Sequence, residues 1–169
     1  PKRSMPLVHQ IGYFGEVTHL IEGLGQLKFL DKQLETPINL ICFTYGPFKP
    51  NFIQRHFKHI KIHYRKFQFD YEYMLNSTSD IDFVVCPMFW TDVNYRNKRI
   101  FKSKFQPNEV RRVEKFSTNS GRAHLACSLG LPLIVNPTED IIREFYWLPD
   151  YCIFENGDDL LRGFLALTD

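Results

Sequence analysis

The sequence lacks any apolar run that approaches the about 20 residues a membrane-spanning helix requires. Its first residues, PKRSM, also lack the apolar stretch of a signal peptide, and we expect a cytoplasmic protein. The chain does not begin with Met, so we expect that a segment upstream has been removed. Internal repeats and low-complexity segments are absent, and a charged fraction of 24% with a net charge of +2 excludes collagen-like, disordered and coiled-coil proteins.

Cysteine is scarce, and no two cysteines form a C-x-x-C pair. The four cysteines, Cys42, Cys86, Cys127 and Cys152, each lie in an apolar context. In such contexts cysteine behaves as a small buried hydrophobic residue. The spacing therefore favours reduced structural thiols over a zinc site, a disulfide or a nucleophile.

Apolar and aromatic residues are plentiful. The 169 residues are 44% hydrophobic and include sixteen Phe, eight Tyr and two Trp. A chain of this size removes roughly 70% of its unfolded surface from water, enough for a core without disulfides or metals. The length fits one domain, residues 1–169, or one half of a two-domain enzyme.

The small net charge hides an uneven distribution. Residues 49–66 contain six Lys or Arg and no acid, and residues 89–116 contain eight Lys or Arg against three acids. These segments carry +6 and +5, which leaves −9 for the rest of the chain. Two basic segments on an acidic body suggest an anionic ligand, although many charge runs are only solvated surfaces.

Short β-rich runs alternate with stretches of helical spacing. Strands are predicted over residues 8–14, 39–44, 60–64, 80–87, 131–135 and 151–154, and helices over residues 18–33, 50–59, 69–76, 117–129, 138–147 and 158–167. Six strands with intervening helices predict an α/β fold with a Rossmann-like, doubly wound parallel sheet and helices on both faces. The polar, basic and aromatic stretch 88–115 is too long for an ordinary connection, so we expect an insertion or a functional loop there.

Ligands of such folds bind outside the carboxyl ends of the strands, where the winding order reverses. Gly15 follows the first predicted strand, either as a simple turn or as a place where a ligand approaches the backbone. The helix predicted from residue 117 begins among small polar residues and two cations. Its candidate ligands for a phosphate or diphosphate are Ser117, Asn119, Ser120, Gly121, Lys115 and Arg122.

Several motifs in this order resemble one enzyme family. They are I-G-Y-F-G-E near the start, D-I-D-F-V-V-C-P in the middle, and G-L-P-L-I-V, N-P-T-E-D-I-I-R-E-F and E-N-G-D-D-L in the last third. Together they resemble the C-terminal domain of GT-B glycosyltransferases, over nearly the whole chain except the insertion at 88–115. The chain would then be one lobe of a two-lobed enzyme.

The resemblance implies that this domain binds a nucleotide-diphosphate sugar as donor, while a missing N-terminal domain binds the glycan or lipid-linked acceptor. Gly15 would lie near the diphosphate, and Lys115 or Arg122 would neutralise it. Contacts with the nucleotide or the sugar would come from Glu16, Arg65, Phe67 and Glu139. The isolated domain would bind its donor without turnover, in a pathway of cell-surface polysaccharide or glycan synthesis.

The sequence also departs from the family. Many retaining members carry two glutamates eight residues apart on the helix where this chain has Ser117 and Leu125. The basic pair common after the first strand is replaced by Glu16 and His19. The catalytic residue and the stereochemical outcome therefore stay unassigned, and the chain is either a divergent member or a donor domain without activity.

Histidines do not indicate a metal. His56, His59 and His63 have a metal-like spacing, but neither an acid nor a Cys accompanies them, and we expect no metal site and no cofactor beyond the donor. His124 is predicted to make a packing contact rather than to bind a phosphate.

The basic aromatic stretch has three interpretations. The stretch lines the ligand cleft, makes a peripheral contact with an anionic membrane, or binds nucleic acid. We favour the cleft and consider nucleic acid the weakest of the three. Two other functions remain open for the whole chain: a non-catalytic binding module that docks on a partner through this stretch, and a nucleotide-sugar epimerase.

Overall fold

Five strands alternate with helices in the computed structural model of the chain. The structure describes residues 9–15, 20, 24–45, 51–87 and 121–168, without the side chains of residues 51, 52 and 139. The elements in chain order are β1 (Gln10–Phe14), α2 (Leu24–Gln33), β2 (Ile38–Thr44), α3 (Asn51–Gln54), β3 (Ile60–Lys66), α4 (Tyr71–Ser77), β4 (Phe83–Cys86), α6 (Gly121–Ser128), β5 (Leu133–Val135), α7 (Glu139–Glu144), the 3-10 helix η2 (Asp150–Cys152) and α8 (Gly157–Thr168).

The strands form one parallel sheet in the order β3-β2-β1-β4-β5. The chain winds outward from β1 through β2 to β3, and then returns to the other side of β1 to place β4 and β5. The winding therefore reverses between β1 and β4. This arrangement confirms the predicted α/β class with a Rossmann-like parallel sheet flanked by helices.

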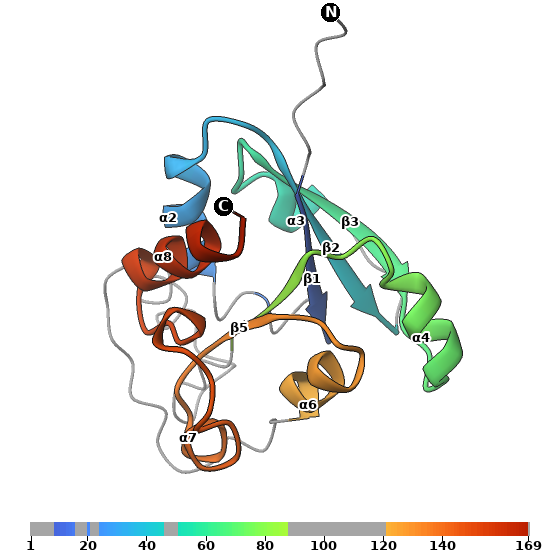
Figure 1. The fold of residues 1–169 in the computed structure, drawn as a ribbon. Helices are drawn as coiled ribbons and strands as arrows, with labels where there is room; N and C mark the ends of the chain where they lie inside the picture. The colour runs from blue at the N-terminus through green and yellow to red at the C-terminus, as the bar shows by residue number, and fades with distance from the viewer. Residues whose placement is uncertain (1–8, 16–19, 21–23, 46–50, 88–120, 169) are drawn as a thin grey trace, which may run out of the picture.

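Two apolar clusters cover the two faces of the sheet. Helices α2, α3 and α8 pack on one face, around Leu27 and Phe164, against the side of β1 that carries Ile11 and Tyr13. Helices α4, α6 and α7 pack on the other face, against the side of β1 that carries Phe14. Figure 1 shows the paired α2 and α8 on one side of the sheet and α6 on the other. Successive side chains of each strand thus pack into two different cores, which explains the nearly unbroken apolar runs in the sequence.

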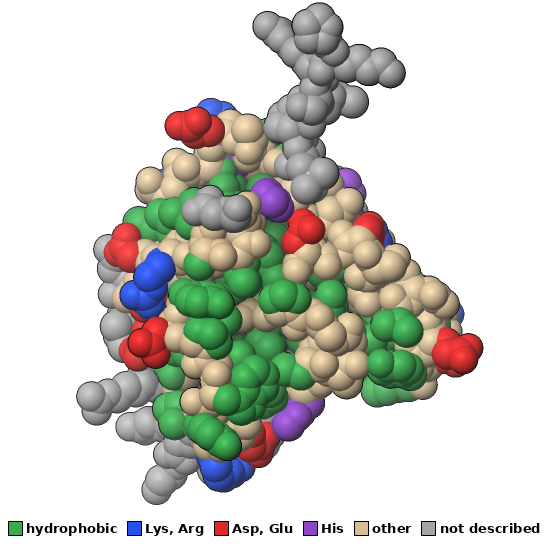
Figure 2. Space-filling model, viewed as in Figure 1, with side chains coloured by type: hydrophobic (Ala, Val, Ile, Leu, Met, Phe, Trp, Pro, Cys, Tyr) green, Lys and Arg blue, Asp and Glu red, His purple; other side chains and the backbone are tan. Residues whose placement is uncertain are grey.

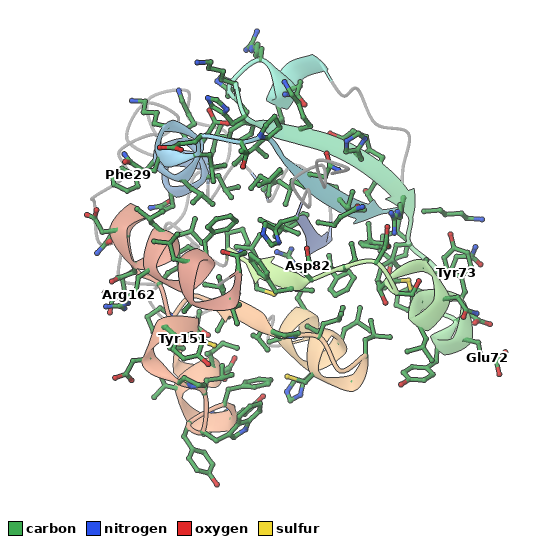
Figure 3. The ribbon with its side chains drawn as sticks, turned by 45° about the horizontal axis from the view of Figure 1, so that its top comes forward. Phe29, Glu72, Tyr73, Asp82, Tyr151 and Arg162 are labelled. Atoms are coloured by element: carbon green, nitrogen blue, oxygen red, sulfur yellow. The ribbon has the colours of Figure 1, made fainter. Side chains whose placement is uncertain are left out.

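Helix α8 lies directly against α2 because its first residue is a glycine. A Cβ atom at Gly157 would lie 2.5 Å from Cγ of Phe29, so any larger side chain would displace that ring. Phe29 projects from α2 on the side of the molecule where Arg162 marks α8 (Figure 3). The motif E-N-G-D-D-L thus closes the fold through a close helix contact.

The prediction of a sixth strand over residues 151–154 is wrong. The chain forms η2 over Asp150–Cys152 after Pro149, and only Ile153 pairs with β5, through a single bridge to Val135. The backbone amide of Phe154 donates to the Val135 carbonyl at 3.0 Å, and the side-chain amide of Asn136 donates to the Phe154 carbonyl at 2.7 Å. The Asn136 amide thus satisfies a carbonyl that has no ladder partner, and the described sheet has five strands.

Other elements differ from the prediction only in length. The helix expected over 138–147 ends at Glu144, since the chain turns at Phe145. The helix expected over 50–59 covers only Asn51–Gln54, while β3 continues to Lys66. No described helix is both long enough and apolar enough to cross a membrane.

Two side chains hold the outer strand β3 in place. The buried Asp31 of α2 accepts hydrogen bonds from the backbone amides of Lys58, His59 and Ile60, the shortest at 2.7 Å. The Gln54 amide donates to the Ile60 carbonyl at 3.0 Å and accepts from the Ile62 amide at 2.8 Å. These side chains take the place of a further strand at the start of β3.

We expect the Asp31→Ala variant to lower the free energy of unfolding by about 3 kcal/mol, because it leaves buried amides without an acceptor. Urea unfolding followed by circular dichroism measures the change. Lys32→Ala, at the exposed next position of the same helix, is the matched control and is expected to have little effect. Equal stability of the two variants would contradict this role of Asp31.

Candidate functional site

The carboxyl ends of all five strands lie at one edge of the sheet. Phe14 ends β1 and Cys86 ends β4, and the reversal of the winding lies between them. Helices that diverge from a reversal point leave room for a ligand above the strand ends. The residues that follow β1 and those that begin α6 are therefore the first to consider.

Gly15 adopts a backbone conformation that other residues rarely take. Its φ is +130°, and its amide donates to the Phe43 carbonyl of β2 at 3.1 Å. A Cβ atom on Gly15 would lie 2.9 Å from Nε of Arg122 and 3.0 Å from its Cζ. The positive φ fits the interpretation of Gly15 as a turn residue, and the group that lies against its backbone is the guanidinium of Arg122. The approach of a ligand to Gly15 stays a prediction.

Arg122 reaches across the carboxyl edge from the second position of α6. Its Cζ lies 5.5 Å from the ring centroid of Tyr13, a residue of the core on the α2 and α8 side, whereas α6 itself packs on the opposite face. Burial raises the pKa of the Cys86 thiol to about 12, and the positive charge of Arg122 works against that rise. The guanidinium is thus close to the ends of both β1 and β4, at the point of reversal.

An aromatic cluster occupies the same edge of the sheet, at the ends of β2 and β3, one and two strands from β1. It consists of Tyr45 after β2, Phe67 after β3, and Phe69. The ring centroids are 4.7 Å apart for Tyr45 and Phe67, and 5.3 Å apart for each of the other two pairs. Tyr45 is 54% exposed and Phe69 is 91% exposed. The rings meet at tilted or edge-on angles, and a cluster of aromatic rings that is exposed in this way marks a surface that can bind a flat or apolar group.

Arg65 lies near the end of β3, two residues before Phe67. Its guanidinium donates to both carboxylate oxygens of Asp80, at 2.5 and 2.6 Å, and to the Ser77 carbonyl at the end of α4, at 2.6 Å. It also lies over the ring of Phe43, 5.9 Å from the centroid. Arg65 therefore fixes α4 and the end of β3, next to Phe67, through its contact with Asp80.

The structure brings some predicted site residues together and leaves others undescribed. Gly15 and Arg122 meet at the reversal point, and Gly121 begins α6 beside them. Arg65 and Phe67 lie two strands away at the same edge. Glu139 begins α7 next to the N-cap residue Thr138, but its side chain is outside the description. Also outside the described residues are Glu16, Lys115, Ser117, Asn119, Ser120 and the basic stretch 88–115.

Sequence reasoning missed Tyr45 and Phe69. Tyr45 directly follows the predicted strand 39–44, so its position at the carboxyl edge was available from the strand pattern. Phe69 was predicted to begin a helix over 69–76, whereas α4 begins at Tyr71 and Phe69 belongs to the connection before it. The exposure of both rings was not available from the strand pattern, because aromatic residues next to a strand are as common in cores as on surfaces.

The histidines occupy structural positions. Nε2 of His63 lies 3.0 Å from Oδ1 of Asn39, and the His59 amide binds Asp31. His124 packs its ring against Phe145, at a centroid distance of 4.8 Å, as predicted. Within the described part of the chain, no three His, Cys, Asp or Glu residues are grouped to hold a metal ion. All four cysteines are free thiols.

Comparison with known proteins finds similar solved structures but no sequence relative. No family of protein sequences matches the chain, and no curated protein matches it. MurG of Acinetobacter baumannii has a similar structure, with a TM-score of 0.33 and 20% sequence identity over 51% of this chain. The match covers 26% of the MurG chain, so this chain spans only part of that protein.

The contact between Arg65 and Asp80 predicts a pH-dependent stability. Hydrogen bonds from Arg65 are the main reason that the pKa of Asp80 lies below its ordinary value. The pair therefore stabilises the fold above the ordinary aspartate pKa of about 3.9, and this contribution is lost as the pH falls through the lowered pKa of the folded state. Since both side chains are partly exposed, Asp80→Asn is expected to cost at most about 1 kcal/mol near neutral pH.

Urea unfolding at about pH 7 and about pH 3 tests this expectation, with the difference between wild type and Asp80→Asn shrinking at the lower pH. Glu72→Gln on α4, the helix that precedes Asp80, is the control, because Glu72 points away from the body of the molecule (Figure 3). A difference that is equal at both pH values would contradict a role for the Asp80 charge.

Proposed function

We propose that this domain is the donor-binding half of a GT-B glycosyltransferase and holds a nucleotide-diphosphate sugar at the carboxyl edge of its sheet. The observation that carries the proposal is the placement of the Arg122 guanidinium on Gly15, at the reversal between β1 and β4. The motifs that resemble the GT-B donor domain support the same assignment.

The diphosphate would lie over Gly15, between the end of β1 and the start of α6. Arg122 supplies a planar donor of several N–H groups, which suits the oxygens of a phosphate. The backbone amides in the first turn of α6 add donors and the positive end of the helix dipole. In this proposal Lys115, Ser117, Asn119 and Ser120 complete the anion site.

The nucleobase would lie on the aromatic cluster of Tyr45, Phe67 and Phe69. Because neighbouring strands lie about 4.8 Å apart, the ends of β1 and β3 are separated by on the order of 10 Å. A ribose separates the base from the phosphates of a nucleotide, so a stacking surface and an anion site at this spacing suit one ligand. The exposed rings offer the π-faces on which bases stack.

Arg122 and Lys115 would promote transfer by stabilising the charge that develops on the leaving nucleotide. The bond between the anomeric carbon and the diphosphate oxygen breaks, and a bond from an acceptor hydroxyl to that carbon forms. The hydroxyl proton passes to a base outside this chain, on the acceptor domain. Glu16 and Glu139 are the acids proposed to contact the sugar or the ribose, and the isolated domain is expected to bind its donor without turnover.

A non-catalytic binding module is the competing function, and exposed apolar residues away from the site favour it. In the described part of the chain they include Tyr71 and Leu75 on α4 and Tyr146 and Trp147 after α7. Figure 2 shows apolar side chains gathered over α4 and over the lower part of this face. A module of this kind would bind a protein partner and no nucleotide, which the next experiment distinguishes.

We expect Arg122→Ala to weaken binding of the tightest nucleotide diphosphate about tenfold or more, since a hydrogen bond to a charged group contributes about 1.5–3 kcal/mol. Isothermal titration calorimetry of the isolated domain with nucleotides and nucleotide sugars measures the affinity. Arg162 pairs with Asp159 of its own helix at 3.1 Å, away from the proposed site. Arg162→Ala is therefore the control, and we expect this variant to bind as wild type does. If the wild-type domain binds none of these compounds, or if Arg122→Ala binds as tightly as wild type, the proposal is wrong.

We expect Phe69→Ala to weaken nucleotide binding by about 1–3 kcal/mol while it leaves the affinity for inorganic pyrophosphate unchanged, because the ring contacts only the base. The same calorimetric titrations with the two ligands measure this difference. Tyr146→Ala removes a ring that is 84% exposed and serves as the matched control. An equal loss of affinity for pyrophosphate would show that the cluster supports the fold of the site rather than the base.

A further inference from the structure

Helix α6 carries Arg122, and it is too short to be stable by itself. It has eight residues, Gly121–Ser128, and isolated helices below about 12 residues are marginal in water. The position of Arg122 therefore depends on the contacts that hold α6 in the fold. Ala123 and Ala126 are buried against the sheet, and the Tyr71 hydroxyl of α4 donates to the Ser128 carbonyl at 2.9 Å.

A third contact joins the first turn of α6 to α7. Nε2 of His124 lies 2.7 Å from Oε2 of Glu144, and the imidazole packs against the ring of Phe145 at a centroid distance of 4.8 Å. His124 is two residues from Arg122, which places the two side chains on different sides of the helix. One side chain thus faces the proposed anion site while the other ties the same turn of helix to α7.

We propose that His124 is a positioning residue for Arg122, and that protonation of its imidazole strengthens the contact with Glu144 and thereby the affinity of the anion site. The inference rests on the proposed function, because it concerns the regulation of that same site. The neutral imidazole donates to Glu144 only when its proton is on Nε2, whereas the protonated ring carries a proton on both nitrogens. The hydrogen bond is then charge-assisted, and such bonds are roughly twice as strong as neutral ones.

The charged groups around His124 determine how strong this effect is. On α7, Glu144 also accepts from Arg143 at 3.0 Å, and Arg143 binds Asp140 at 2.8 Å. Of these groups, the Glu144 carboxylate is the one shown in contact with His124. On α6 itself, the charged neighbour is Arg122, and the Cys127 thiol, whose pKa burial raises, stays uncharged.

The test is the affinity of the full domain for sulfate and for its tightest nucleotide, at about pH 5.5 and about pH 8, across which histidine side chains commonly change charge. Sulfate stays a dianion over this range, so any change in its binding reports on the protein. Both side chains are partly exposed, so we expect wild type to bind sulfate about two- to fivefold more tightly at the lower pH.

Three variants separate positioning from a simple charge effect. His124→Gln keeps a donor toward Glu144 without titrating, so it is expected to bind at both pH values with nearly equal affinity. Glu144→Gln keeps His124 but removes the charged partner, and it is expected to lose the pH dependence as well. Arg162→Gln, whose ion pair lies within α8, is expected to behave as wild type. Thermal melting of each variant checks that the fold is retained.

The outcomes are distinct for the two proposals. If wild type binds anions with a pH-independent affinity, or if Glu144→Gln keeps the full pH dependence, the positioning role of His124 is overturned while the anion site stands. If wild type binds neither sulfate nor any nucleotide, the proposed function fails and this inference fails with it.

Discussion

The position of β1 between β2 and β4 is the constraint on which the rest of the structure depends. Each parallel neighbour requires a crossover, so a chain that first winds from β1 toward β3 and then returns to β4 must place its helices on opposite faces. Tyr13 then faces one core and Phe14 the other. The first residue free of both cores is Gly15, whose positive φ lets the chain leave the sheet while Arg122 lies against its backbone. The geometry of the candidate site is thus a consequence of strand order.

Strand order alone does not place Arg122, because α6 is connected to β4 by a long segment of chain. The contacts of α6 supply what the topology does not. Its two buried alanines allow a close approach to the sheet, while Tyr71 of α4 and Glu144 of α7 hold its two ends. A cation on a helix that is held from three directions loses less freedom when it binds an anion, which is the benefit of preorganisation in binding. The packing of three helices on one face thus fixes where the Arg122 charge lies at the edge of the sheet.

Much of this architecture follows from local patterns in the sequence. The strand residues feed two cores, so β2 and β4 read as continuous apolar runs, and Gly15 and Arg122 were identifiable from their positions after β1 and at the start of a helix. The failed strand at 151–154 also has apolar residues, but Pro149 and the Asn136 side chain decide against a ladder there. The pairing of Arg65 with Asp80 and the clustering of Tyr45 with Phe69 depend on how α4 and two connections fold back, which periodicity does not encode.

Two residues near the carboxyl edge, Arg65 and Phe69, differ in whether folding alone explains them. Arg65 has a structural role that accounts for its charge, since it closes α4 and pairs with Asp80. Phe69 has no such account: it is 91% exposed, and hydrophobic burial does not stabilise a ring that remains in water. The two rings that it contacts belong to Tyr45 and Phe67, which follow neighbouring strands at the edge where Gly15 and Arg122 meet. The ligand that we propose, a nucleotide-diphosphate sugar, has an anionic part and a flat part and would contact both features at once.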